Sequence, residues 1–317
     1  MNSRQKEIFK ISTEENTRKR NCIIDGCNKK AINSHLLQRN GILKNISNNG
    51  HLVERKLKDP FKWAKNDEIS EFREIGLKKA FSLPLMCSKH DSEIFKPIET
   101  PPLDFENYHA QLLLSYRVTL AEIRKKEIVV DTYTRIINSE KITLRNPEND
   151  KAFLRGTKYG MKDLTQFKKL IEAEIKTPTN SFHFEYFEFS KFETYASAIF
   201  SPPKTFTFGS TNPEKPYEQG FIHVIPLEDG LKVIVGYHKQ YVNRYLKKFV
   251  KKWRKTNNDN LSEQLSQVFC RNIENWGTSP NMYKSMTKEN IELFNKYFYL
   301  SEILPGFMIP KLNLFEK

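Results

Sequence analysis

Two closely spaced pairs of metal-ligating side chains constrain this chain more than any other feature of its sequence. Cys22 and Cys27 form a Cys-x4-Cys pair, and the IIDG between them contains an Asp-Gly turn. Cys87 and His90 form a second pair, Cys-x2-His. Zinc takes four soft or borderline ligands in a tetrahedron, so a knuckle that supplies two ligands needs two more from elsewhere. The spacing therefore predicts a structural zinc site made by Cys22, Cys27, Cys87 and His90.

The alternative interpretation is that Cys22 and Cys27 are buried thiols and that His90 lies on the surface. The chain has only four cysteines, which is too few for a disulfide scaffold, and a reducing cytosol would keep them as thiols. Three of the four fall in the two pairs, which favours a metal site. Cys270, in LSQVFCRNI, lies on an expected apolar helix face, and its expected role is burial.

The charge of the chain favours polyanionic partners. Its 317 residues carry a formal net charge of +14, with a pI near 9.4. Nucleic acid is the first expected partner, and an acidic membrane surface or an acidic protein is the second. The 38% hydrophobic and 12% aromatic content predicts a folded protein. No apolar run approaches the roughly 20 residues that span a bilayer, and the first 20 residues lack the apolar core of a signal peptide, so a cytoplasmic protein is expected.

The order of patterns predicts an α+β protein with two domains. Three prolines in KPIETPPLD suggest a boundary, which gives a zinc module at residues 1–100 and a mixed domain of helices and antiparallel strands at residues 101–317. Within the first domain, the spacing of Ile69, Phe72, Ile75 and Phe81 suggests a short helix. No internal repeat or low-complexity tract is found.

The second domain changes its periodicity along the chain. Helices are expected from residue 105 to about 137 and near 160–176, whereas SFHFEYFEF alternates like a strand. Two further strands flank Asp229-Gly230, a strong hairpin signal. His183, His223 and His238 lie in or at the ends of these strand patterns and are expected to be structural.

The segment Gln240–Lys255 is predicted to form a helix that is both basic and aromatic. Four aromatic residues recur every four positions from Tyr241 to Trp253, and the segment contains no acidic residue. One interpretation is a helix whose aromatics enter the core and whose lysines are solvated. Its basic face could also contact phosphates without reading sequence. The candidate nucleic-acid-binding residues are Arg244, Lys247, Lys248, Lys251, Lys252, Arg254 and Lys255.

Motifs for nucleotide-dependent chemistry are missing from the sequence. There are only 12 glycines, and neither a Walker A sequence nor GxGxxG occurs. ATP-dependent and dinucleotide-dependent enzymes are therefore disfavoured.

The first 100 residues resemble a known family of nucleases. Paired cysteines, a histidine soon afterwards in NSHLLQRNGILKNISNNGHL, an Asn-containing connection and a returning Cys-x2-ligand pair are similar to the treble-clef zinc fold of HNH endonucleases. The resemblance covers roughly residues 20–100. It implies that His35, after the first knuckle, is the general base. It also implies that Asp91, directly after the last zinc ligand, helps to bind a catalytic divalent metal such as Mg or Mn.

The resemblance departs from the family pattern at Ser34, where many members have Asp or His. His51, in NNGHLVE, could supply the ligand that Ser34 cannot, with help from Glu54 or Glu99. An imidazole can deprotonate the attacking water, while a metal stabilises the charge that develops on the phosphate. Alternatively, Asp91 is an ordinary helix N-cap and His51 a surface residue.

Three functions follow from these features. The first is a metal-dependent nuclease that cuts DNA or RNA. Its expected place in antiphage defence rests on analogy. The second is a noncatalytic nucleic-acid-binding protein in which the same zinc is structural. The third is a protein-interaction module, with a protein partner or a homo-oligomer.

Overall fold

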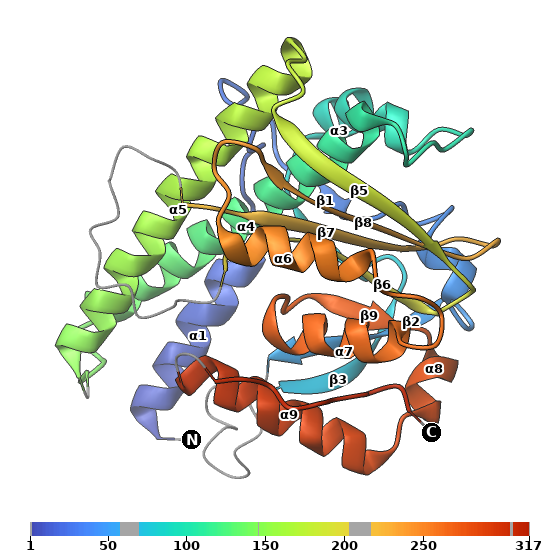
Figure 1. The fold of residues 1–317 in the computed structure, drawn as a ribbon. Helices are drawn as coiled ribbons and strands as arrows, with labels where there is room; N and C mark the ends of the chain where they lie inside the picture. The colour runs from blue at the N-terminus through green and yellow to red at the C-terminus, as the bar shows by residue number, and fades with distance from the viewer. Residues whose placement is uncertain (1, 58–69, 145, 203–216, 305–306, 317) are drawn as a thin grey trace.

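In the part of the chain that the structure describes, an antiparallel sheet of seven strands lies between two sets of helices (Figure 1). The computed structural model describes residues 2–57, 70–144, 146–202, 217–304 and 307–316. In spatial order, the strands of the sheet are β3 (Ser70–Gly76), β2 (His51–Leu57), β9 (Trp276–Thr278), β6 (Thr194–Phe200), β7 (Gly220–Pro226), β8 (Leu231–His238) and β5 (Phe182–Phe189). The α+β fold class is thereby confirmed.

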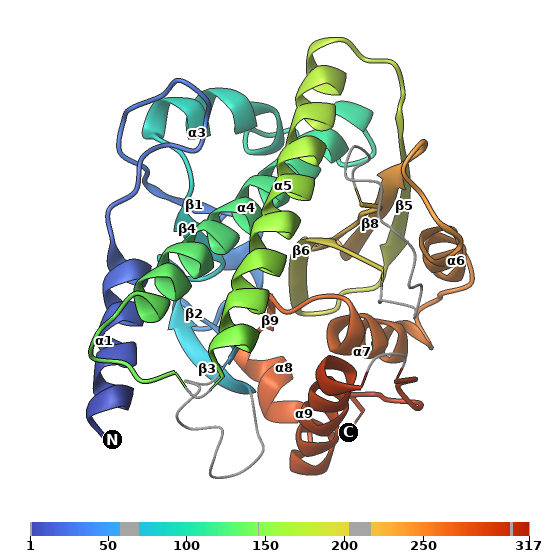
Figure 2. The same ribbon diagram turned by 90° about the vertical axis from the view of Figure 1, so that its left-hand side faces the viewer.

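Helices cover both faces of the sheet. Figure 2 shows α4 and α5 side by side on one face, with α6 and α7 beyond the strands. The helices are α1 (Ser3–Thr17), α3 (Ser88–Phe95), α4 (Tyr108–Ile137), α5 (Pro147–Lys176), α6 (Arg244–Trp253), α7 (Leu261–Arg271), α8 (Pro280–Ser285) and α9 (Lys288–Ile303), with short 3-10 turns η1 (Leu43–Ile46) and η2 (Lys96–Ile98).

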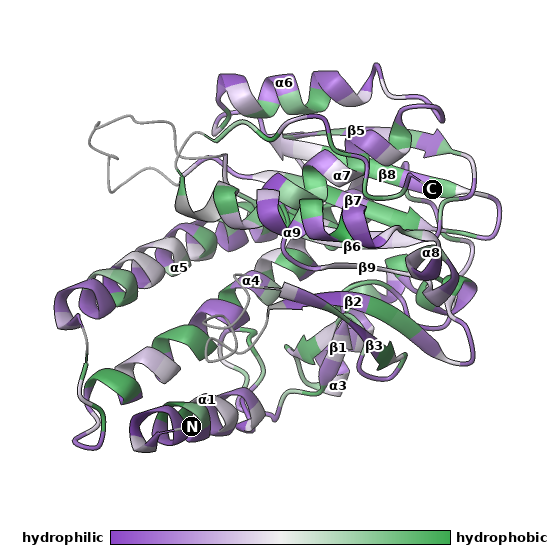
Figure 3. Ribbon diagram, turned by 90° about the horizontal axis from the view of Figure 1, so that it is seen from below, coloured by the Kyte–Doolittle hydropathy of each residue, from purple (hydrophilic) through white to green (hydrophobic). Residues whose placement is uncertain are grey.

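Strand β7 shows how the sheet separates two hydrophobic cores. Phe221 and Ile225 belong to the core that includes α4 and α5, whereas Ile222 and Val224 belong to the core that includes α6, α7 and α9. Every residue of β7 is buried, because successive side chains point to opposite faces and both faces are covered. Figure 3 shows the resulting contrast between the mostly hydrophobic β7 and the many hydrophilic residues of α1 and α6.

Most of the predicted elements are present. The expected helix at 105–137 is α4, and the one near 160–176 is the second half of α5, which begins earlier, after the cap Asn146. Strands β7 and β8 pair as the predicted hairpin, with the N–H of Leu227 bonded to the carbonyl oxygen of Gly230 at 2.8 Å.

The prediction of a short helix around residues 69–81 is wrong, because Ser70–Gly76 forms strand β3. The strand pairs with β2 along its whole length, and the Phe72 ring packs edge-on against Trp276 with centroids 5.4 Å apart. Long-range pairing and packing therefore override a local pattern that was compatible with either element. Ile69 lies outside the described residues.

The first hundred residues contribute to the same sheet as the rest of the chain. Strand β2 pairs with β9, so that Glu54 lies opposite Gly277. A separate two-stranded ribbon consists of β1 (Asn33–His35) and β4 (Ser82–Pro84). His35, the candidate general base, is the last residue of β1.

His223 is fully buried between α4 and β6. Ser197 Oγ lies 2.7 Å from its Nδ1, and Ser115 Oγ lies 3.3 Å from its Nε2. Burial lowers the pKa of His223 to about 3, so its imidazole is neutral at physiological pH. Both ring nitrogens have partners, and the residue connects a helix to the sheet.

Candidate metal centre

The first pair of predicted ligands lies on a tight knuckle. The Cys22 N–H donates a hydrogen bond across the turn to the Lys29 carbonyl at 2.8 Å, and the Cys27 N–H donates to the Ile24 carbonyl at 3.1 Å. Gly26 adopts φ = +77°, a left-handed conformation that glycine takes without steric cost. The Asp-Gly sequence therefore shapes the loop that brings the two thiols to the same side.

The second pair lies at the start of a helix. Cys87 is the N-cap residue of α3, and His90 lies in the first turn. The two pairs are held together through the backbone, because the Ile23 N–H bonds the Leu85 carbonyl at 2.9 Å and the Ile32 N–H bonds the Met86 carbonyl at 2.7 Å. Residues more than 50 positions apart in sequence are thus fixed beside one another.

The four predicted ligands form a cluster that could hold a metal ion. Their ligand atoms all lie within 4.8 Å of one another. Cys27 Sγ is 3.9 Å from Cys87 Sγ, and Cys22 Sγ is 3.3 Å from His90 Nδ1. Tetrahedral zinc, with Zn–S near 2.3 Å and Zn–N near 2.0 Å, requires separations of about 3.8 and 3.5 Å. The donor set and its dimensions therefore fit zinc.

The surroundings of the cluster favour the thiolate form of Cys87 and oppose that of Cys22. Burial raises the pKa of the Cys22 thiol, whereas a hydrogen bond from the His90 backbone N–H lowers the pKa of Cys87. A helix N-terminus favours negative charge at Cys87. The positive guanidinium of Arg124 lies close by and donates to the Asn21 carbonyl at 2.6 Å. Three thiolates with one Zn²⁺ carry a single negative charge, which Arg124 can balance.

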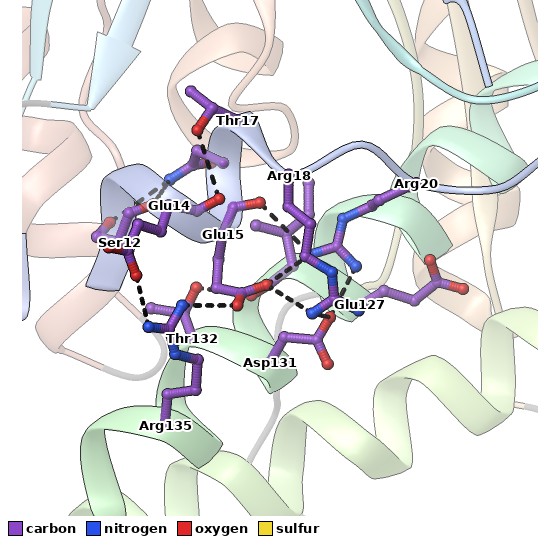
Figure 4. A network of polar contacts seen from close by, with 12 residues as sticks. Ser12, Glu14, Glu15, Thr17, Arg18, Arg20, Glu127, Asp131, Thr132 and Arg135 are labelled. Atoms are coloured by element: carbon purple, nitrogen blue, oxygen red, sulfur yellow. Dashed lines mark hydrogen bonds and ion pairs between the residues drawn. The ribbon is translucent and has the colours of Figure 1, made fainter. Parts of the chain in front are cut away.

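An ion-pair network fixes the chain just before the knuckle (Figure 4). Arg20, at the exit of α1, pairs with Asp131 of α4 at 2.7 Å and with the buried Glu15 at 3.2 Å. Arg135 of α4 also reaches Glu15, at 2.9 Å. Both Arg20 and Glu15 are buried, so these contacts are screened little by solvent. Helix α1 is thereby tied to α4 where the chain leads into Cys22.

His35 is the last residue of β1, and its ring is close enough to Asp91 to feel the charge of that carboxylate. Its Nε2–H donates to the Leu77 carbonyl at 3.0 Å, which leaves Nδ1 as the proton acceptor of the neutral ring. Burial lowers the pKa of His35, the Leu77 contact raises it, the charges of Arg39 and Arg117 lower it, and the charge of Asp91 raises it. With the net pKa lowered, the imidazole is neutral at pH 7 and able to accept a proton.

Asp91 lies in the first turn of α3, but it does not cap the helix, because Cys87 is the N-cap residue. Its Oδ1 is buried and has no hydrogen-bond partner in the described part of the chain. A buried carboxylate oxygen without a partner is costly unless something binds it. The same holds for the Ser34 hydroxyl, which is also buried without a partner among those residues.

The remaining candidates for the catalytic metal lie in other settings. His51 is 48% exposed, contacts the Asn49 carbonyl at 2.9 Å and lies 3.9 Å from Glu74. Glu54 is buried, and its Oε1 accepts hydrogen bonds from the Phe81 N–H at 2.6 Å and the Tyr195 hydroxyl at 3.0 Å. Among the described residues, the Cys3His cluster is the only group of three or more metal-ligating side chains.

Arg117 is a residue near this site that the sequence analysis did not identify. Its side chain, on α4, is 1% exposed. It donates to Glu99 Oε1 at 2.6 Å, and its guanidinium carbon lies 3.9 Å above the Phe95 ring. Because it stands inside a long helix with no surrounding motif, only the packing of α4 against α3 places it beside His35.

The basic helix has both of its expected features. Its apolar side chains, including Phe249 and Trp253, enter the second core, while Lys247, Lys248 and Lys251 are exposed. Arg254, just after the helix, is engaged by Glu185 at 2.8 Å. The exposed basic face is thus mainly that of the three lysines together with the neighbouring Arg244, Lys252 and Lys255.

No protein family, curated protein or solved structure matches this chain. In the part that the structure describes, no helix combines the length and the apolar character needed to cross a bilayer. The function is therefore argued from the site itself.

Proposed function

We propose that the protein is a zinc-containing, HNH-like nuclease that hydrolyses phosphodiester bonds of DNA or RNA. The observation that carries the proposal is a neutral His35 that feels the charge of Asp91, together with the partnerless buried oxygen of Asp91, the residue that follows the cluster ligand His90. The order of knuckle, two-stranded ribbon and helix resembles that of a treble clef and supports the proposal, with His35 on the ribbon and Asp91 on the helix.

The proposed reaction uses the two residues in different roles. His35 Nδ1 takes a proton from the attacking water, while the Leu77 carbonyl holds the ring through Nε2. Asp91 would hold a divalent cation, which supplies charge stabilisation at the phosphate and its leaving oxygen. Cys22, Cys27, Cys87 and His90 would hold a zinc ion, which would fix the ribbon and the helix relative to one another.

Substrate binding is assigned to the exposed face of α6. Its lysines can neutralise phosphates of either strand without reading bases, so binding should weaken steeply with salt. A triple substitution of Lys247, Lys248 and Lys251 by Gln should reduce the slope of log K against log salt by about 3. Filter binding to a single DNA fragment at several salt concentrations measures this slope.

The test of catalysis is cleavage of supercoiled plasmid and structured RNA with Mg, Mn, Ni or Zn. We expect cleavage by the wild type and a loss of at least about 100-fold in His35→Ala and Asp91→Ala, since general-base catalysis contributes 10²–10⁴. His109→Ala is the matched control, because His109 is exposed at the start of α4. Zinc content is measured on every sample, so that loss of activity is separated from loss of the fold.

A noncatalytic nucleic-acid-binding protein is the second candidate. It is favoured by the lack of a third metal ligand beside His35 and Asp91 among the described residues. Salt-sensitive binding by zinc-loaded wild type, without cleavage under any of the four metals, would select it and refute the nuclease. A role in antiphage defence is a further proposal, tested by plating phage on cells that express wild type or His35→Ala.

A further inference from the structure

A cavity of about 390 Å³ lies between α1, α4, the β1–β4 ribbon and strands β2 and β9 of the large sheet. Its size falls within the range of small-molecule sites, which are roughly 300–1,000 Å³. Leu36, Phe81 and Ile128 contribute the apolar part of a mixed wall. A second cavity of about 220 Å³ shares Leu36, Lys125 and Asn275 with it. His35, Asp91 and the four proposed zinc ligands line neither cavity.

Positive charge predominates in the larger cavity. Lys56, Lys79 and Lys125 line it, against the single carboxylate of Glu54. That carboxylate is already occupied, because it pairs with Lys56 at 2.5 Å and accepts two hydrogen bonds from the Phe81 N–H and the Tyr195 hydroxyl. Arg55 also lines the cavity, but its guanidinium stacks 3.6 Å above Phe298, in the opposite core.

Two of these lysines have charge to offer a ligand. Lys79 is exposed and forms no ion pair with any residue that the structure describes. Lys125 is 33% exposed, and its only such partner in the described ranges is Glu122, three positions back along helix α4, at 3.2 Å. A partly exposed pair on a single helix contributes little and can be exchanged for a stronger anion.

Apolar residues border the same cavity. Leu36, Phe81 and Ile128 line it together with the lysines. Trp276 also lines it, but its indole stacks on Phe269 in the opposite core. Lysines for an anion and an apolar wall therefore define the chemistry of the ligand.

We infer that this cavity binds a phosphate-bearing small molecule of nucleotide size. Lys79 and Lys125 contact the phosphates, and the apolar wall covers the rest of the molecule. The inference does not depend on the proposed nuclease activity, because the cavity and the His35 site use different side chains.

The test is isothermal titration of the full chain without divalent metal, which suppresses any cleavage. The probes are ATP, inorganic pyrophosphate and adenosine. We expect ATP to bind one site, with adenosine at least tenfold weaker, and Lys79→Gln and Lys125→Gln each to weaken ATP binding at least tenfold. Pyrophosphate binding as tightly as ATP would assign the site to the phosphates alone, which still supports a phosphate-bearing ligand.

Lys288→Gln is the matched control, because Lys288 lies on α9 and is 85% exposed. Its ATP affinity should equal that of the wild type. Absence of ATP and pyrophosphate binding at millimolar concentration would overturn the inference. Binding that is unchanged in both cavity variants would overturn it as well, because the ligand would then occupy another basic surface such as that of α6.

Discussion

Substitution of Glu174 by Gln should destabilise the protein strongly at neutral pH and much less in acid. Glu174 lies at the end of α5, where its carboxylate accepts hydrogen bonds from the hydroxyls of Tyr108, Thr179 and Ser181 at 2.9, 2.6 and 2.6 Å. The backbone N–H groups of Thr179 and Asn180 also donate to it, at 2.9 and 2.6 Å. This single side chain therefore connects α5, the start of α4 and the approach to β5.

The size of the effect follows from the pKa of Glu174. Burial raises this pKa, but the hydrogen bonds from Ser181, Thr179 and Tyr108 outweigh burial and lower it from 4.5 to about 2. A pKa that is lower in the folded state stabilises that state at every pH above 4.5, and the stabilisation is lost as the pH falls through 2. One pKa unit corresponds to about 1.4 kcal/mol. The difference between the folded and unfolded pKa of Glu174 therefore stabilises the folded state by about 3 kcal/mol at pH 7 and about 1 kcal/mol at pH 3.

Urea unfolding followed by circular dichroism at pH 7, 5 and 3 measures this prediction. Glu174→Gln should lose about 3 kcal/mol of unfolding free energy at pH 7 and at pH 5, and less than half of that at pH 3. Glu148→Gln is the control, because Glu148 lies on the same helix and is 76% exposed. A loss below about 1 kcal/mol at pH 7, or a loss that stays constant down to pH 3, would refute the argument from hydrogen bonding.

Two further predictions concern the metal centre and its support. The wild type should hold about one zinc per chain, and Cys27→Ser should lose most of it. Cys270→Ser should retain the zinc, because Cys270 is a buried cysteine outside the cluster. Equal zinc in both variants by elemental analysis would contradict the proposed ligand set. Glu54→Ala should lower the free energy of unfolding by about 2–6 kcal/mol, because it leaves the buried Phe81 N–H and Tyr195 hydroxyl without their acceptor. Tyr195→Phe removes only one of these hydrogen bonds and should lower it by less than half as much in the same unfolding assay.

Local sequence was informative wherever neighbouring residues decide the structure. The Cys-x4-Cys and Cys-x2-His spacings predicted a cluster whose members the fold does bring together, since a turn and a helix start each fix one pair. The same is true of α6, whose four-residue aromatic period identified its buried face. The Asp-Gly signal likewise predicted the β7–β8 hairpin.

Local sequence failed where the partner is distant. The apolar spacing in residues 69–81 suited a helix, but Ser70–Gly76 is a strand because β2 offers it a pairing edge and Trp276 offers Phe72 a surface to pack on. Arg117 carried no signal at all, because its place beside His35 depends on how a long helix packs against a short one.

The sequence by itself thus determined the metal-ligand pairs, the α+β class and the basic helix, because each depends on spacing within a few residues. Only the tertiary structure decided that Glu54 lies opposite Gly277, that Asp91 carries a buried oxygen without a described partner, and that Lys56, Lys79 and Lys125 line one cavity. These three results join segments from different elements, and local patterns are compatible with several such arrangements. The packing of both sheet faces selects one of them.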